Sequence, residues 1–210
     1  MRVTHLTPSG EMGGAECVIL ECIGVGDGWT GTQSSVVTLG PGPFLNAAER
    51  LGATTRLVEA PPTLAALGEA FVSSAAVVRG LFAAVWAFPA FFRRFSRTIA
   101  DLVPHVIHSH GIKTHVLGAL LSRRAPVIWH IHDYVGTRAV SSRLLRLLAH
   151  RCSLAIAVSE SVAQDARRHL PARLPLIVVH NSVDCRRFSP EGRALDLDAL
   201  SELPQAPPGT

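Results

Sequence analysis

Two pairs of histidines end two apolar runs and are the residues best suited to chemistry. The first pair is His108 and His110 in HVIHSHG, and the second is His130 and His132 in VIWHIHD, where Asp133 follows. Residues two apart in a strand face the same side of a sheet, and ligands bind at the carboxyl edge of parallel strands. The pattern therefore predicts up to four imidazoles gathered at that edge.

Such a cluster has two chemical interpretations. Imidazole nitrogens bind zinc, so a metal-dependent hydrolase could use the two pairs. Only one carboxylate, Asp133, lies beside them, and no second ligand set follows. A neutral imidazole can instead exchange a hydrogen bond with a sugar hydroxyl. We favour this second interpretation, in which one histidine is catalytic or binds substrate, the others are structural and no metal is bound.

A glycine pair lies in PSGEMGGAE, residues 8–16, between an expected strand and an expected helix. Backbone N–H groups at a helix N-terminus attract anions, and glycine lets a ligand approach the backbone. Gly13 and Gly14 are therefore candidate contacts for a phosphate or a sugar. The stretch lacks the GxGxxG pattern and the P-loop lysine, and Glu16 could simply favour the first helical turn.

Short apolar runs alternate with longer helical patterns along the chain. Strands are expected at 3–6, 35–39, 55–58, 105–108, 127–131, 154–158 and 176–179. Helices are expected at 15–23, 44–51, 64–99, 114–122, 141–150 and 162–169. The strands are apolar without strict alternation, which is typical of strands buried on both faces. This order predicts a doubly wound α/β fold with a mostly parallel sheet of about seven strands and helices on both faces.

The long helix at 64–99 is unusually apolar. Arg79 is the only charge between residues 71 and 92, while Pro89 interrupts the pattern. We expect this helix to pack on the sheet rather than to span a membrane. A second interpretation is peripheral membrane contact through residues 71–97, in which Arg93, Arg94 and Arg97 meet anionic head groups.

Composition limits the partners and the compartment. The chain has 210 residues, a hydrophobic fraction of 48% and a net charge of +4. Its arginines are scattered rather than clustered with aromatic residues, so nucleic acid is not an expected partner. The four cysteines lack the spacing of metal ligands. The N-terminal stretch MRVTHLTPSG lacks the apolar run of a signal segment. We expect buried, reduced thiols and a cytoplasmic protein that is membrane-associated only if residues 71–97 make the contact described above.

Several of these stretches together resemble glycosyltransferase family 4. They are GGAE, DLVPHVIHSHG, VIWHIHD, AVSES and the late turn VVHNSVDCRRFSP, which occur in the family's order. The resemblance covers residues 1–188 and implies the N-terminal, acceptor-side half of a GT-B fold, which is Rossmann-like. It implies that Asn181, Asp184 and Phe188 form the interdomain hinge, although Ser182 replaces the usual glycine. Residues 189–210 then read as an interdomain linker, and the family's spaced glutamate pair, which marks the C-terminal donor domain, is absent.

The resemblance also implies residue roles and a reaction. His132 matches the catalytic histidine, and the substrate or donor-phosphate contacts are Gly13, Gly14, His110, Lys113 and Asp133. The implied reaction is retaining transfer of a sugar, such as a hexose, from a nucleotide-sugar to an acceptor hydroxyl, with no cofactor. The acceptor would be a sugar, a lipid or a small molecule. This half is expected to be inactive without a donor domain, which a partner could supply in trans. The alternatives are a non-catalytic module that binds a glycan or lipid-linked acceptor, and the metal-dependent hydrolase.

Overall fold

The computed structural model describes residues 1–29, 31–62, 74–183 and 185, without the side chains at 26–29 and 74–86. The strands are β1 Arg2–Thr7, β2 Gln33–Thr38, β3 Thr54–Leu57, β4 Val106–His110, β5 Val127–Ile131, β6 Leu154–Ala157 and β7 Leu176–Val178. The helices are α1 Gly14–Trp29, α2 Pro43–Arg50, α4 Ser74–Leu102, α5 Ile112–Leu120, α6 Ala139–Leu148 and α7 Glu160–His169. Short 3-10 turns occupy Val135–Thr137 and Ala149–Arg151.

All seven strands form one parallel sheet in the order β3-β2-β1-β4-β5-β6-β7. Strands β2 and β3 are added on one side of β1. The chain then crosses back, and strands β4 to β7 are added on the other side of β1. The order therefore reverses between β1 and β4, and parallel α/β sheets bind ligands beyond the carboxyl ends of the strands at such a point. The predicted doubly wound, Rossmann-like fold is confirmed.

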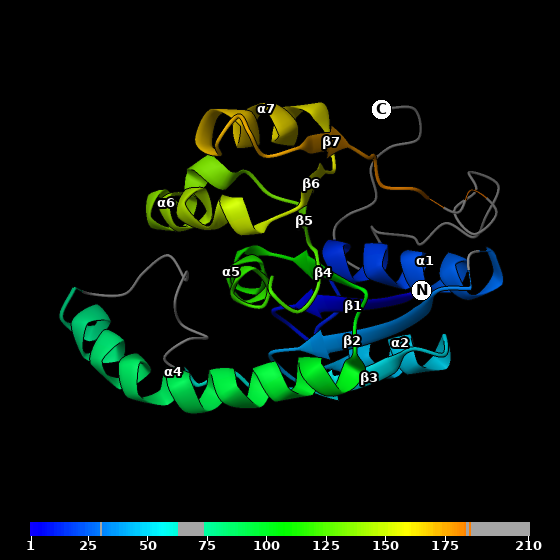
Figure 1. The fold of residues 1–210 in the computed structure, drawn as a ribbon, viewed down its shortest axis with the longest axis horizontal. Helices are drawn as coiled ribbons and strands as arrows, with labels where there is room; N and C mark the ends of the chain where they lie inside the picture. The colour runs from blue at the N-terminus through cyan, green and yellow to red at the C-terminus, as the bar shows by residue number, and fades with distance from the viewer. Residues whose placement is uncertain (30, 63–73, 184, 186–210) are drawn as a thin grey trace, which may run out of the picture.

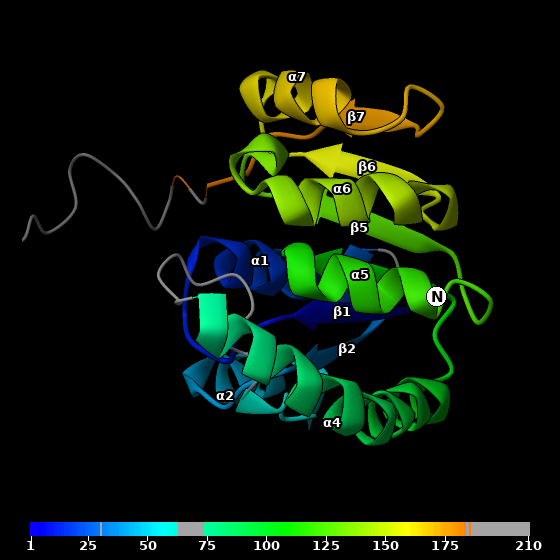
Figure 2. The same cartoon turned by 90° about the vertical axis from the view of Figure 1, so that its left-hand side faces the viewer.

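Helices cover both faces of this sheet, as Figures 1 and 2 show. Helices α1 and α2 lie on one face, where Ile19, Ile23 and Phe44 pack against Val36. Helices α4, α5, α6 and α7 lie on the other face, where a larger apolar cluster is buried. Right-handed crossovers account for this division, because the direction of strand addition changes after β3.

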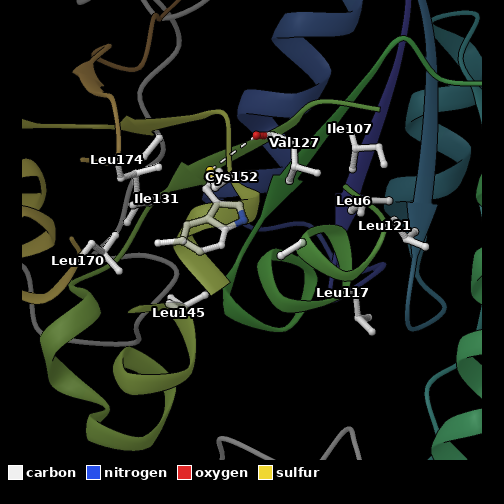
Figure 3. Packing of buried hydrophobic residues seen from close by; sticks show 14 of the residues in the cluster. Leu6, Ile107, Leu117, Leu121, Val127, Ile131, Leu145, Cys152, Leu170 and Leu174 are labelled. Atoms are coloured by element: carbon white, nitrogen blue, oxygen red, sulfur yellow. Dashed lines mark hydrogen bonds between the residues drawn. The ribbon is translucent and has the colours of Figure 1, made fainter. Parts of the chain in front are cut away.

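The larger cluster explains why the central strands are apolar on this face. Leu6 of β1, Ile107 of β4 and Val127 of β5 are fully buried in this cluster (Figure 3), and all three lie close to Gly118 of α5. Trp129 of β5 is the largest side chain in the cluster and is also fully buried. The two faces of β4 and β5 therefore differ. Ile107, Val127 and Trp129 face the apolar cluster, whereas the residues that alternate with them on the opposite face include His108, His110 and His130.

Most helix ends differ from the prediction by one to three residues, and among the C-terminal ends that of α1 differs most. Helix α1 continues to Trp29, beyond the predicted end at residue 23, since Ile19 and Ile23 pack into the core and outweigh the low helix propensity of Gly24, Gly26 and Gly28. Helix α4 continues through Pro89 and is not interrupted there. Phe91, Phe95 and Ile99 are buried, which confirms that this part of α4 packs on the sheet.

The predicted contact through residues 71–97 lies partly outside the described part of the chain. Residues 71–73 and the side chains of 74–86 are not described, whereas Arg93, Arg94 and Arg97 are exposed. The Arg94 guanidinium donates a 2.6 Å hydrogen bond to the carbonyl of Glu59. Among the helices that the structure describes, none is long and apolar enough to cross a membrane. The linker predicted at 189–210 lies outside the described residues.

Candidate active site

Strands β1, β4 and β5 bring histidines from three parts of the chain to one place. His5 of β1 lies opposite His108 of β4, and His110 lies opposite His130 of β5. His132 follows β5 directly, and its ring centroid lies 4.4 Å from that of His130. These five side chains, here called the histidine cluster, lie side by side on the face of the sheet that α1 covers. His110 and His132 reach the carboxyl edge that the sequence predicted, whereas His5 and His108 lie nearer the middle of their strands. His5 was not among the predicted members.

Hydrogen bonds order the rings at the carboxyl end of the histidine cluster. His110 Nδ1 lies 3.0 Å from His132 Nε2, and His110 Nε2 lies 3.5 Å from His5 Nδ1. His110 is fully buried, while its backbone carbonyl accepts a 2.6 Å hydrogen bond from Thr114 Oγ1. Because His110 contacts His132 through a ring nitrogen, it fixes the orientation of the half-buried His132.

Burial keeps the histidine cluster neutral. It lowers the pKa of His5 to about 4 and the pKa values of His108 and His130 to about 3, with neighbouring histidines adding to the effect. The pKa of His110 is well below its ordinary value for the same reason. Burial also lowers the pKa of His132, although the charges of Asp133 and Glu16 oppose that shift. Neutral imidazoles can both donate and accept hydrogen bonds.

The loop between β1 and α1 adds a carboxylate to this site. Glu16 lies in the first turn of α1 and is buried, and its Oε1 accepts a 2.5 Å hydrogen bond from Thr7 Oγ1. A Cβ atom at Gly13 would lie 2.8 Å from Glu16 Oε2, so a side chain there would press on the carboxylate. Gly14 has open space around it. The glycine pair thus leaves the backbone accessible beside Glu16.

A close backbone crossing holds the same loop in place. Gly10 accepts a 2.9 Å hydrogen bond from the amide of Phe44, at the start of α2. A Cβ atom on Gly42 would lie 2.1 Å from the carbonyl oxygen of Gly10, and Gly42 has a φ of +154°. Both positions therefore require glycine, and the loop before α1 is tied to the loop before α2.

A cavity of about 150 Å³ collects the site residues at the carboxyl edge. Glu16, His110, His132 and Asp133 line it together with the apolar side chains of Pro8, Ile112, Val135 and Leu145. Buried His115 also lines it, so the cavity combines a carboxylate pair with three neutral imidazoles in an otherwise largely apolar wall. Lys113, also predicted as a contact, lies half-buried in the first turn of α5 and is not part of this wall.

A larger groove of about 610 Å³ runs along α1. Its floor includes His5, His108 and His130, and one wall is the segment 179–183 that follows β7. Asn181, predicted as a hinge residue, is exposed in that wall. Asp184 and Phe188, the other predicted hinge residues, lie outside the described residues.

The histidine cluster could also hold a metal ion. Ligand nitrogens of His5, His108 and His110 lie within 4.8 Å of one another, as do those of His110, His130 and His132. Both ring nitrogens of His130 are buried without a hydrogen-bond partner, as is Nε2 of His108. An all-imidazole donor set suits zinc, copper or nickel. The cluster therefore fits a late transition metal as well as it fits a stack of neutral rings.

Sequence reasoning missed four residues of the site, namely His5, Thr7, Glu16 and His115. His5 and Thr7 alternate along the first strand, which was the only available signal that they face the same side as the histidine pairs. Glu16 was noted only for its place in the first helical turn. The sequence alone could not assign His5, Thr7 and Glu16 to the site, because their assignment requires that β1 lies beside β4.

Comparison with known proteins identifies the family and the fold. A sequence profile described as Glycosyltransferase Family 4 matches residues 30–187. No curated protein matches the sequence. Among solved structures, HepE from Anabaena in complex with UDP and glucose is similar, with a TM-score of 0.67 and 22% identity over 96% of this chain and 49% of that chain. Sucrose-phosphate synthase from Thermosynechococcus elongatus has a TM-score of 0.63 and 14% identity over 97% of this chain and 53% of that chain.

A glycosyltransferase from Rickettsia africae is also similar, with a TM-score of 0.58 and 11% identity over 97% of this chain and 50% of that chain. At these identities the solved structures show the fold alone, which for this chain is one half of a GT-B fold. The chain spans about half the length of each of them. Because the family profile matches most of the sequence, and the observed sheet has the same Rossmann-like fold, the chain belongs to glycosyltransferase family 4.

Proposed function

We propose that this chain is the acceptor-binding half of a retaining glycosyltransferase. The complete enzyme would transfer a sugar from a nucleotide-sugar to an acceptor hydroxyl. The observation that carries the proposal is the cavity at the carboxyl edge of β1, β4 and β5, where Glu16, His132 and Asp133 meet in a family 4 chain. A sugar presents several hydroxyl groups, and this set of carboxylates and imidazoles can accept and donate hydrogen bonds to them.

His132 would be the residue nearest the reacting sugar. Its Nε2 is engaged with His110, so Nδ1 is the ring nitrogen left for a substrate hydroxyl. Gly13 and Gly14 would bring backbone N–H groups at the start of α1 close to the donor phosphates or the acceptor. His110 would act by positioning His132, Asp133 would contribute a negative charge in the cavity wall, and Lys113 would contribute a positive charge beside the cavity.

The donor half would supply the remaining chemistry. We propose that it binds the nucleotide-sugar and neutralises the departing phosphate, so that no metal or other cofactor is required. Without it, stabilisation of the leaving group and closure of the cleft are lost, and this half alone is inactive. The donor half lies in a longer chain or in a partner protein. HepE was solved with UDP-glucose, which suggests a uridine diphosphate hexose as the first donor to test.

We also infer a cytoplasmic location. All four cysteines are free, and Cys17, Cys22 and Cys185 are exposed, whereas only Cys152 is buried. The prediction of buried thiols is therefore wrong for three of them. Exposed free thiols are more typical of a reducing compartment than of a secreted protein.

The proposal can be tested with the protein purified from its source cells. We expect it to consume at least one of a panel of uridine, guanosine and cytidine diphosphate sugars when an extract of cellular saccharides and lipids is added. The measurement is release of the nucleoside diphosphate, and a labelled donor identifies the product. If no donor in the panel is consumed with the extract, the glycosyltransferase function is contradicted.

The histidine cluster supports a second candidate, the metal-dependent hydrolase. The two sets of three imidazole nitrogens are the observation in its favour. Metal analysis of the same purified protein separates the candidates, since about one equivalent of zinc per chain would favour the hydrolase. A protein that binds acceptor saccharides without consuming any donor would instead be the non-catalytic binding module.

A further inference from the structure

The outer surface of α6 carries apolar side chains where a helix of this kind normally carries polar ones. Val140 is 80% exposed, Leu147 69% and Leu144 41%. They are four and three residues apart, so they lie on one side of the helix. Leu145 and Ser142, which are buried, face the core from the opposite side. We call Val140, Leu144 and Leu147 the α6 stripe.

The α6 stripe is not explained by the fold. A helix packed on a sheet is expected to be apolar toward the core and polar toward solvent. Helix α6 lies in the outer layer beside α5 and α7, as Figure 2 shows. A group of exposed aliphatic side chains in that position is typical of a surface that binds a membrane or another protein.

The charge around the α6 stripe has a single sign. Arg138, Arg143 and Arg146 are all exposed, and no Asp or Glu occurs between Asp133 and Glu160. None of the three arginines forms an ion pair within the part of the chain that the structure describes. Helices that lie in the interface of an anionic membrane typically combine exposed aliphatic residues with flanking arginines, as α6 does.

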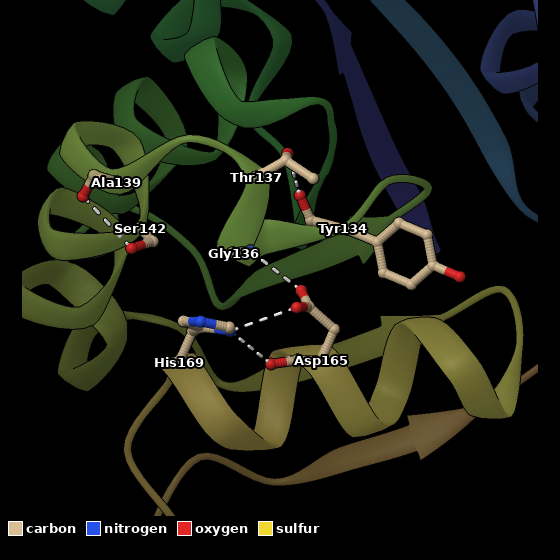
Figure 4. Close-up of polar contacts among 7 residues, drawn as sticks. All are labelled: Tyr134, Gly136, Thr137, Ala139, Ser142, Asp165 and His169. Carbon is tan, nitrogen blue, oxygen red and sulfur yellow. Dashed lines mark hydrogen bonds and ion pairs between the residues drawn. The ribbon is translucent and has the colours of Figure 1, made fainter.

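A hydrogen-bonded loop connects this surface to the cavity. Residues 134–138 join Asp133 to α6, and the amide of Gly136 donates a 3.0 Å hydrogen bond to Asp165 Oδ2 of α7 (Figure 4). Thr137 Oγ1 donates a 2.8 Å hydrogen bond to the carbonyl of Tyr134. Tyr134 itself is 47% exposed, and tyrosine is enriched at membrane interfaces. The loop therefore holds α6 at a fixed position relative to the site.

We propose that the α6 stripe and Arg138, Arg143 and Arg146 dock this protein on an anionic lipid bilayer. The aliphatic side chains enter the boundary between head groups and acyl chains, and the guanidinium groups pair with lipid phosphates. This surface differs from residues 71–97, which the sequence suggested for membrane contact. The proposal concerns binding alone, so it stands or falls independently of sugar transfer.

The test is co-sedimentation of the full chain with vesicles of phosphatidylcholine and phosphatidylglycerol in equal parts. We expect binding to these vesicles and little binding to pure phosphatidylcholine. The Val140→Gln/Leu147→Gln variant is expected to lower the partition coefficient at least about tenfold, because it removes the aliphatic contact. Arg143→Gln/Arg146→Gln is expected to lower it by roughly the same factor on anionic vesicles. Arg50→Gln/Leu51→Gln, at the exposed end of α2 on the other face of the sheet, is the matched control and should bind normally.

Three outcomes would overturn the proposal. The first is the absence of binding to anionic vesicles by the parent chain. The second is binding that survives both α6 variants, which would assign the contact to another surface such as Arg93 and Arg94 of α4. The third is a change in the sedimentation velocity of the Val140→Gln/Leu147→Gln variant in the absence of lipid. That result would make the α6 stripe an interface with a second copy or with another protein.

Discussion

Acidification from about pH 7 to about pH 5 is expected to remove most of the stability of this domain. Burial lowers the pKa of His5 to about 4 and the pKa values of His108 and His130 to about 3. The folded chain keeps these rings neutral, whereas the unfolded chain protonates them below about pH 6.5. The free energy of unfolding therefore falls as the pH drops below that value, and the loss continues to the folded pKa values.

The size of this effect follows from proton linkage. Each such histidine lowers the free energy of unfolding by about 1.4 kcal/mol for each pH unit below about 6.5. Three of them therefore lower it by about 6 kcal/mol between about pH 6.5 and pH 5. A typical domain has only about 5–15 kcal/mol of total stability. The pKa values of His110 and His115 are also lowered by burial, so both act in the same direction.

Urea unfolding at a series of pH values measures this dependence. The His130→Leu variant is expected to flatten the slope by about 1.4 kcal/mol per pH unit. Neither ring nitrogen of His130 has a hydrogen-bond partner, so leucine leaves no orphaned group behind. The exposed His150, outside the cluster, provides the control variant His150→Asn, which should follow the parent chain. An unfolding free energy that stays constant down to about pH 5 would contradict the buried, neutral histidine cluster.

Replacement of His132 by alanine is expected to lower sugar transfer by about 100-fold or more in the native enzyme. His132 lies in the cavity wall and is held by its 3.0 Å hydrogen bond to His110. Its pKa is lowered mainly by burial, so the ring is neutral near pH 7 and can share a proton with a substrate hydroxyl. The loss should appear in kcat at saturating donor, because we propose that the donor is bound chiefly by the donor half.

Two variants give this prediction its controls. His110→Ala leaves His132 in place but removes its partner, so it should lower kcat less than His132→Ala does. His150→Ala lies outside the site and should leave kcat unchanged. Initial rates of nucleoside diphosphate release measure all three. Transfer by His132→Ala within a few-fold of the parent rate would show that the ring takes no part in the reaction.

The sheet was predictable because its strands carry a strong local signal. The run PVIWHI is apolar except for His130, and β5 occupies Val127–Ile131 as predicted. A strand whose two faces are both buried can be recognised from its continuous apolar run, without alternation of apolar and polar residues. The fourth strand was placed slightly early, at 105–108 rather than Val106–His110, since the alternating histidines obscure its apolar pattern.

The composition of the site was only partly predictable, because it depends on which strands are neighbours. His108 and His110 were expected to meet His130 and His132, and the pairing of β4 with β5 brings them together. His5 joins them only because β1 lies on the other side of β4, and sequence spacing carries no record of that order. The same is true of Glu16, whose bond to Thr7 depends on how the first loop turns back over the sheet.

The central claim is that this chain supplies only the acceptor side of a glycosyltransferase. The most direct measurement compares nucleoside diphosphate release by isolated residues 1–210 with release by the native protein, using the same donor and the same acceptor extract. We predict turnover by the native protein and none above background by residues 1–210, since we propose that the groups that stabilise the leaving phosphate lie in a donor half. Turnover by residues 1–210 at a rate comparable to that of the native protein would contradict the account.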